Sequence, residues 1–153
     1  ALKLLELFKD SHVMPELLDG DEIRKLTGEY GFDKASRIRH NLRVGQMAAT
    51  FEKEGKVVVV ALISPYVEIR NEVRNMCDDF IEVYVAANLE CCIQRDPKGL
   101  YKKALAGEIQ QFTGISSPYE KPMNPEIILD TEYLSAEESA RMIYDFYRKK
   151  IIN

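Results

Sequence analysis

The chain has 153 residues, of which 46% are hydrophobic and 30% are charged, and its formal net charge is −4. These values are typical of one globular domain, here residues 1–153, and they exclude a disordered chain. The negative charge gives no basis for binding nucleic acid or a membrane surface, so we predict neither partner. The longest apolar run, residues 57–63, is too short to span a bilayer.

The cysteines and histidines give no sign of a disulfide framework or a metal site. Cys77, Cys91 and Cys92 form no CxxC pair, and neither His12 nor His40 belongs to a metal-ligand pattern. We therefore predict free, buried thiols in a reducing cytoplasm. No secretion signal opens the sequence, which also favours a cytoplasmic protein.

Helical and strand patterns alternate along the chain. We predict, in order, the end of a helix at residues 1–9, a strand at 16–18, a helix at 33–54, a strand at 57–62, a helix at 66–76, a strand at 80–85, a helix at 89–94, a strand at 126–129 and a final helix. Asp33 is suited to cap the long helix, and Gly55 is suited to end it. Ser135 and Glu138 form a capping box before the final helix. The β-branched run at residues 57–62 predicts a strand buried on both faces.

This alternation predicts an α/β fold around a parallel sheet. Ligands of such sheets bind beyond the carboxyl ends of the strands. Two strand ends carry notable residues here: the acidic turn Asp19–Asp21 and the turn Ile63–Pro65. Paired carboxylates at the first turn could hold a metal or accept a proton, but the spacing alone favours a solvated turn that caps a helix.

Arginines are concentrated on two predicted helices that follow strand ends. The first helix carries Arg37, Arg39 and Arg43, and the second carries Arg70 and Arg74. The alternative interpretation of each group is a basic surface stripe. Together, five arginines near the carboxyl ends of strands favour a ligand with several negative charges.

Residues 96–120 fit no ordinary element. The stretch contains lysines, three glycines and widely spaced aromatic residues, among them Phe112. Long excursions inside compact domains are usually functional lids or disordered segments. Because lysines stabilise the charge that develops on a transferred phosphoryl group, we predict a lid that handles a nucleotide.

These segments together resemble the adenylylsulfate kinase family. The resemblance rests on an ordered series: DGDEIR at 19–24, GFDKASR at 31–37, VVVVALISPY at 57–66, RD at 95–96, KGLYKKALAGEI at 98–109, FTGI at 112–115 and SPYEKP at 117–122. It implies a P-loop NTPase-like three-layer α/β sandwich with a parallel sheet and a lid. It also implies transfer of a phosphoryl group from ATP to the 3′-hydroxyl of adenosine 5′-phosphosulfate in sulfate assimilation, giving PAPS.

The resemblance also implies roles for individual residues. Phe32 and Phe112 would enclose the adenine of the acceptor, and Arg24 and Arg37 would hold its phosphosulfate. The implied sets are Asp21, Ser64 and Lys98 for catalysis; Asp19, Arg24, Phe32, Arg37, His40, Asn41, Ile63, Ser64, Lys98, Gly99, Leu100, Phe112 and Thr113 for acceptor binding; Arg95 and Asp21 for ATP; and Asp21 for Mg²⁺. The implied partners are a second copy in a homodimer and a fused or associated ATP sulfurylase.

Three departures from the family pattern keep alternatives open. The sequence has no GxxxxGK[ST] run, so we expect the family's first strand and P-loop to lie outside this chain. Ser36 and His40 replace an acidic residue and an asparagine near the acceptor, which leaves open another acceptor, such as a cytidine diphosphate-like phosphoramidate. Ala86 replaces an aspartate. A catalytically silent nucleotide-binding domain that partners a sulfurylase is the remaining alternative.

Overall fold

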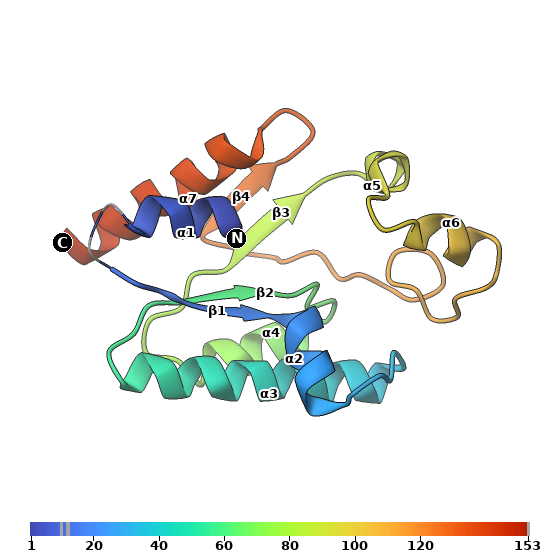
Figure 1. The fold of residues 1–153 in the computed structure, drawn as a ribbon, viewed down its shortest axis with the longest axis horizontal. Helices are drawn as coiled ribbons and strands as arrows, with labels where there is room; N and C mark the ends of the chain where they lie inside the picture. Colours follow the sequence, from blue (N-terminus) through green and yellow to red (C-terminus); the bar gives the residue numbers. More distant parts are fainter. Residues whose placement is uncertain (10, 12, 153) are drawn as a thin grey trace.

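The computed structural model describes residues 1–9, 11 and 13–152, so His12 lies outside the described residues. Helices and strands alternate along the chain as the sequence predicts (Figure 1). The elements are α1 Leu2–Lys9, β1 Glu16–Asp19, α2 Gly20–Thr27, α3 Lys34–Lys53, β2 Val58–Ala61, α4 Val67–Arg74, β3 Val83–Ala86, α5 Leu89–Arg95, α6 Leu100–Leu105, β4 Ile127–Asp130 and α7 Ala136–Ile152.

The four strands form two parallel pairs. Strand β1 pairs with β2, with Asp19 opposite Ala61, and β3 pairs with β4, with Ala86 opposite Asp130. The strands point toward the side of the molecule that carries α2, α5 and α6 (Figure 1). The parallel α/β arrangement is therefore confirmed, but within the described residues the sheet is interrupted between β2 and β3.

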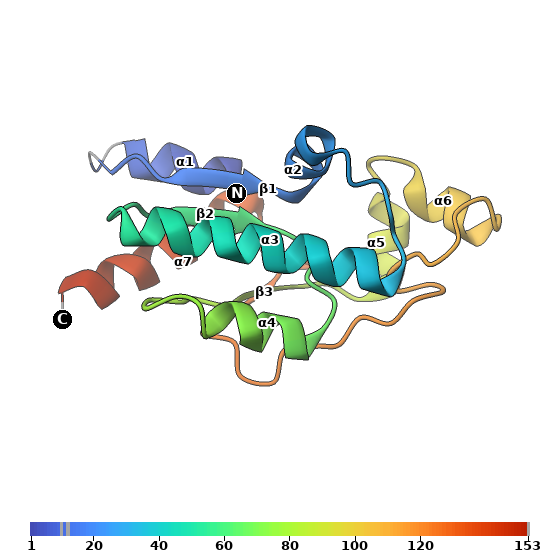
Figure 2. The same ribbon diagram turned by 90° about the horizontal axis from the view of Figure 1, so that it is seen from below.

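Helices cover the strands on two sides. Helices α3 and α4 lie on one side, and α1 and α7 lie on the other (Figures 1 and 2), which gives the predicted three layers. One core cluster, Leu4, Phe8, Ala140 and Tyr144, joins α1 to α7, and the other, Leu18, Ile23, Val44 and Ala48, joins β1, α2 and α3. Burial of such apolar side chains is the main source of stability for a domain of this size.

Burial of β2 is less complete than the sequence predicts, and β3 is also partly exposed. Val60 in β2 is 42% exposed and Val85 in β3 is 62% exposed, so neither strand is buried on both faces. In the described part of the chain, each of these two strands is hydrogen-bonded to a neighbouring strand along one edge, and its other edge is unpaired. The cysteines Cys77, Cys91 and Cys92 are free, as predicted, but they are half-buried and not fully buried.

The helix boundaries follow the capping signals. Asp33 accepts from the Ser36 amide (2.9 Å), and Gly55 adopts the left-handed conformation (φ +78°) just beyond the end of α3. The Glu138 amide donates to Ser135 Oγ (3.2 Å), while Glu138 Oε2 accepts from the Ser135 amide (2.8 Å), completing the capping box.

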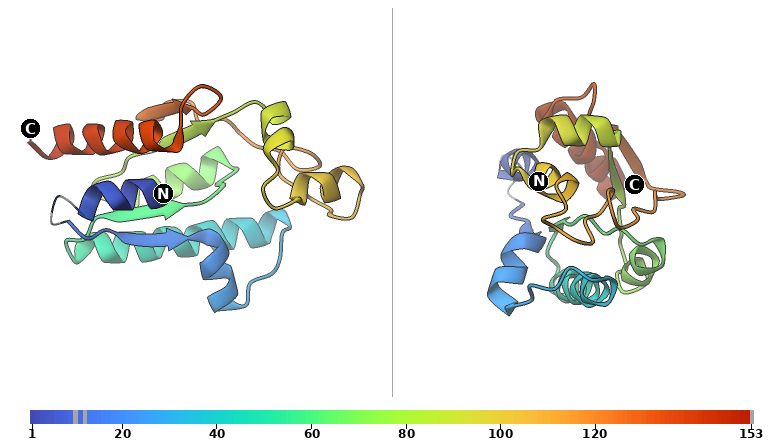
Figure 3. Two further views of the ribbon diagram at one scale, coloured as in Figure 1. Left: turned by 45° about the horizontal axis from the view of Figure 1, so that its top comes forward. Right: turned by 90° about the vertical axis from the view of Figure 1, so that its right-hand side faces the viewer.

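The lid contains a helix that the sequence pattern did not predict. Helix α6 begins after Gly99, whose backbone is left-handed (φ +65°), and its six residues are too few for a clear periodic signal. Together with α5 and the following loop, it lies beyond the carboxyl ends of the strands (Figure 3). This placement sets the lid over the turns that were predicted to carry the chemistry.

Candidate functional site

The two carboxylates of the acidic turn after β1 have different surroundings. Asp19 caps α2, because its Oδ1 accepts from the amides of Asp21 (2.9 Å) and Glu22 (3.3 Å). The side chain of Asp21 is 64% exposed and points to the lid, where Lys98 Nζ lies 2.6 Å from its Oδ2. The capping interpretation therefore holds for Asp19, whereas Asp21 does not cap the helix and its exposed carboxylate pairs with Lys98.

The Asp21–Lys98 pair fixes the charge of both groups. The hydrogen bond from Lys98 lowers the pKa of Asp21 below its usual range, and the same bond raises the pKa of Lys98. Asp21 is thus ionised at neutral pH, which is the state that accepts a proton or coordinates a cation. The contact also brings the lid to the end of β1, across 77 positions of sequence.

Arg24 and Phe32 lie together at the loop between α2 and α3. The Arg24 guanidinium donates to the carbonyls of Glu29 (3.2 Å) and Gly31 (3.0 Å), and its carbon lies 5.2 Å from the centre of the Phe32 ring. Phe32 is 56% exposed. An exposed ring beside a fixed cation is suited to a planar, anionic ligand.

Arg37 joins helix α3 to the lid. It is 7% exposed, and its guanidinium donates to Thr113 Oγ1 (2.5 Å) and to the carbonyl of Gln111. The alternative interpretation, a basic surface stripe, therefore does not hold for Arg37. Arg37 and Thr113, both predicted acceptor residues, are brought together by the fold.

His40 and Asn41 are buried side chains of α3, and His40 lies beside Gly20 of the acidic turn. His40 is 1% exposed, and its Nδ1 lies 3.6 Å from Glu29 Oε2. Burial, and next the nearby charge of Arg24, lower the pKa of His40, so the ring is neutral at pH 7. A Cβ on Gly20 would stand 2.4 Å from Leu62 Cδ2 and 3.4 Å from His40 Nε2, so a larger residue here would displace the Leu62 side chain.

The second turn, after β2, presents Ile63 and Ser64. Ile63 is 67% exposed, and Ser64 has a left-handed backbone (φ +43°), which is uncommon for a residue other than glycine. The Ser64 carbonyl accepts from Arg70 Nη1 (2.6 Å). The structure thus places both residues just beyond the carboxyl end of β2, as the sequence predicts, and their contact with the acceptor stays a prediction.

Phe112 faces a neighbour within the lid. Its ring packs edge-on against Tyr101, with centroids 4.9 Å apart, and its amide donates to Ser116 Oγ (2.9 Å). Leu100, in the same part of the lid, is 37% exposed, and Arg95 is bound to Thr131 Oγ1 (3.3 Å) and to the Thr131 carbonyl. Stacking of Phe112 on an adenine remains a prediction.

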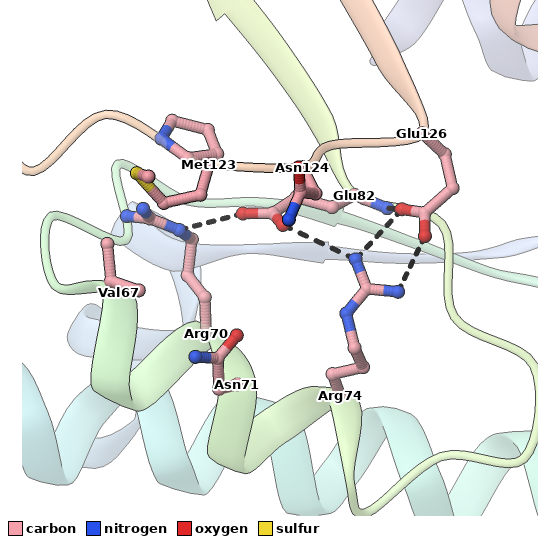
Figure 4. Close-up of a pocket in the computed structure, with 9 residues that line it drawn as sticks. Val67, Arg70, Asn71, Arg74, Glu82, Met123, Asn124 and Glu126 are labelled. Atoms are coloured by element: carbon pink, nitrogen blue, oxygen red, sulfur yellow. Dashed lines mark hydrogen bonds and ion pairs between the residues drawn. The ribbon is translucent and has the colours of Figure 1, made fainter.

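Arg70 and Arg74 have carboxylate partners instead of the predicted anionic ligand. Arg70 Nε lies 2.7 Å from Glu82, and Arg74 Nη1 lies 2.6 Å from Glu126, around a cavity of about 380 Å³ (Figure 4). Sequence reasoning missed this network. The only available signal was the acidic residue just before each of strands β3 and β4.

The chain matches the family model for adenylylsulphate kinase over residues 1–130. The chain belongs to the adenylylsulphate kinase family. It is 51% identical over 133 residues to a probable adenylyl-sulfate kinase of Halalkalibacterium halodurans, a match that covers 85% of this chain and 66% of the relative. It is 41% identical over 156 residues to one of Aeropyrum pernix, covering 99% of this chain and 85% of that relative.

Solved structures of this family confirm the predicted P-loop NTPase-like fold. The structure of a Mycobacterium tuberculosis APS kinase in complex with AMPPNP and APS superposes with a TM-score of 0.90 at 36% identity. This match covers 97% of our chain and 88% of the other. No helix among the described residues is long and apolar enough to cross a membrane.

Proposed function

We propose that this adenylylsulphate kinase family member binds adenosine 5′-phosphosulfate and takes part in phosphorylation of its 3′-hydroxyl by ATP, giving PAPS. The observation that carries the proposal is the close likeness to a family member in complex with AMPPNP and APS. The arrangement of Asp21, Arg37 and the lid at the carboxyl ends of the strands supports it.

The acceptor would bind between α2, α3 and the lid. Arg24 and Arg37 offer two guanidinium groups to its phosphosulfate, and the rings of Phe32 and Phe112 offer flat apolar faces to its adenine. The ionised Asp21 would accept the proton of the 3′-hydroxyl, and Lys98 would offset negative charge near the reacting oxygen. Closure of the lid would exclude water, whose reaction with ATP competes.

Asp21 is also the residue suited to Mg²⁺. Proteins often bind Mg²⁺ through one or two carboxylates and leave the other positions to water and substrate phosphates. The exposed, ionised Asp21 fits that pattern as a single ligand, and no cluster of three or more metal-binding side chains exists among the described residues. Mg²⁺ would neutralise charge on the transferred phosphate.

Residues 1–153 account for the acceptor side of the site more fully than for the ATP side. Arg95 and Asp21 are the residues we assign to the nucleotide donor. The sequence contains no GxxxxGK[ST] run, the loop that cradles the phosphates of a nucleoside triphosphate, so no contact to them is assigned to residues of this chain. From the family resemblance we further propose that the protein forms a homodimer and associates with an ATP sulfurylase. The free thiols fit a cytoplasmic location, which we also propose.

Calorimetry with adenosine 5′-phosphosulfate and with AMP tests acceptor binding directly. We expect the phosphosulfate to bind more tightly than AMP, because its second anionic group reaches the guanidinium groups of Arg24 and Arg37. A preference for AMP, or no binding of either, would refute the acceptor assignment. The transfer is tested by chromatographic detection of PAPS and ADP formed from adenosine 5′-phosphosulfate and ATP in the presence of Mg²⁺. Asp21→Asn should reduce this reaction while acceptor binding persists.

A further inference from the structure

Arg70 makes three different contacts around one guanidinium. Its side chain is 9% exposed, although it lies on α4, outside the acceptor site described above. Nη1 donates to the Ser64 carbonyl (2.6 Å), Nη2 donates to the Glu120 carbonyl (2.7 Å), and Nε lies 2.7 Å from Glu82 Oε1. One planar group thus binds the turn after β2, the end of the lid and the start of β3.

The contact with Ser64 holds an unfavourable backbone conformation. A positive φ of 43° is sterically costly for serine, and such residues persist only where their surroundings fix them. A buried, charged donor on the Ser64 carbonyl is a strong local restraint, because charge-assisted hydrogen bonds are stronger than neutral ones. Ile63 and Ser64 are the residues of this turn that we assign to the acceptor.

The contact with Glu120 fixes the end of the lid. The Glu120 amide donates to the Pro65 carbonyl (2.8 Å), and Glu120 Oε2 accepts from the Val67 amide (2.7 Å), where it caps α4. Arg70 adds its bond to the Glu120 carbonyl and lies 6.0 Å from the ring centre of Tyr119. The last residues of the lid are therefore bound to the same turn that carries Ser64.

Arg74 shows that the ion pair alone does not explain Arg70. It lies one helical turn further along α4 and contacts Glu82 (3.3 Å) and Glu126 (2.6 Å), so it shares a carboxylate with Arg70 (Figure 4). Its described partners are these two carboxylates, at the starts of β3 and β4, and the ring of Phe80, whose centre lies 4.8 Å away, and none of them belongs to the Ser64 turn or the lid. A comparison of Arg70 and Arg74 variants therefore distinguishes the effect of the ion pair with Glu82 from the effect of contact with the Ser64 turn and the lid.

We propose that Arg70 is a positioning residue, which sets the Ser64 turn of the acceptor pocket and ties the end of the lid to it. The guanidinium can do both at once because its donors point in fixed, divergent directions. A lysine could keep the charge beside Glu82 but could not replace all three contacts. The link to acceptor binding rests on the proposed function, whereas the link between the turn and the lid does not.

Residue-resolved hydrogen exchange of the ligand-free chain tests the structural part. In Arg70→Lys, we expect the amides of Glu120 and Val67 to exchange at least about tenfold faster than in the wild type. Arg74→Lys is the matched control, and its Glu120 and Val67 amides should exchange as in the wild type. Equal exchange in the two variants would overturn the proposal.

Calorimetry with adenosine 5′-phosphosulfate tests the functional part. We expect Arg70→Lys to weaken binding at least about fivefold and Arg74→Lys to leave it unchanged. Faster exchange in Arg70→Lys with unchanged affinity would overturn the positioning role. If the wild type does not bind, the proposed function fails, and the exchange experiment still decides the link between turn and lid.

A further variant guards against loss of folding. Arg70→Lys should keep the unfolding midpoint near that of Arg74→Lys, because both retain a cation beside Glu82. Should Arg70→Lys not fold, the double variant Arg70→Gln/Glu82→Gln removes both buried charges and leaves neither unpaired. It should show the same faster exchange at Glu120, and wild-type exchange there would refute the proposal.

Discussion

Arg37 should control opening of the lid, and Arg37→Met tests this at nearly constant side-chain volume. The wild-type guanidinium donates to Thr113 and Gln111, 76 and 74 positions away in sequence. A hydrogen bond to a charged group contributes about 1.5–3 kcal/mol. This contribution already allows for exchange with water, so loss of the two bonds should cost the closed lid at least about 2 kcal/mol, which enlarges the open population at least about 30-fold.

Hydrogen exchange at the amides within the lid measures this population. The Gly114 amide donates to the Ser117 carbonyl (2.8 Å) and the Phe112 amide to Ser116 Oγ (2.9 Å), so both report local opening. Arg39→Met is the control, because Arg39 is exposed and donates to Ser36 within α3 (2.9 Å). If Arg37→Met leaves exchange in the lid at the wild-type rate, the inferred closure by Arg37 is wrong.

Three further predictions concern packing, pH and the acceptor. Gly45→Ala should lower the free energy of unfolding by about 1–3 kcal/mol in urea, because its Cβ would lie 2.6 Å from Val73 Cγ2; an unchanged midpoint would contradict this. Arg74 lowers the pKa of Glu126 to about 2, so its stabilising effect is present above the unfolded value of 4.5 and lost as pH falls toward 2. Glu126→Gln should therefore destabilise the protein by about 1 kcal/mol at neutral pH, with a difference from the wild type that shrinks in acid, and a pH-independent difference would exclude this cause. Phe112→Ala should raise the acceptor dissociation constant about 5- to 100-fold, and an unchanged constant would make Phe112 a packing residue of the lid.

The partners of the arginines show how the fold divides similar residues between different tasks. Arg37 and Arg70 are both at least nine-tenths buried, and each donates to a carbonyl of residues 96–120. Arg37 binds the middle of the lid and Arg70 binds its end. Arg74, with carboxylate partners on both sides, stabilises the starts of β3 and β4. An arginine in this fold therefore contacts the lid or stabilises the strands, depending on which hydrogen-bond acceptors surround it.

The local structure of this protein follows from its sequence. Asp33 with Ser36, and Ser135 with Glu138, are capping pairs separated by three residues, so their geometry is set once the helix forms. Gly55 ends α3 for an equally local reason, because glycine adopts a positive φ without a steric penalty. The alternation of these elements was enough to predict the α/β class, and the ordered motifs were enough to predict the family.

The partners of the charged side chains were decided only by the tertiary structure. Lys98 reaches Asp21 across 77 positions, and Arg70 reaches Glu120 across 50. A guanidinium or an ammonium group can bind many acceptors equally well, so the sequence pattern could not distinguish the ligand that we expected for Arg70 from the carboxylate and carbonyls that it contacts. The incomplete burial of Val60 has the same origin, because burial depends on which strands become neighbours, and that is settled only when the chain has packed.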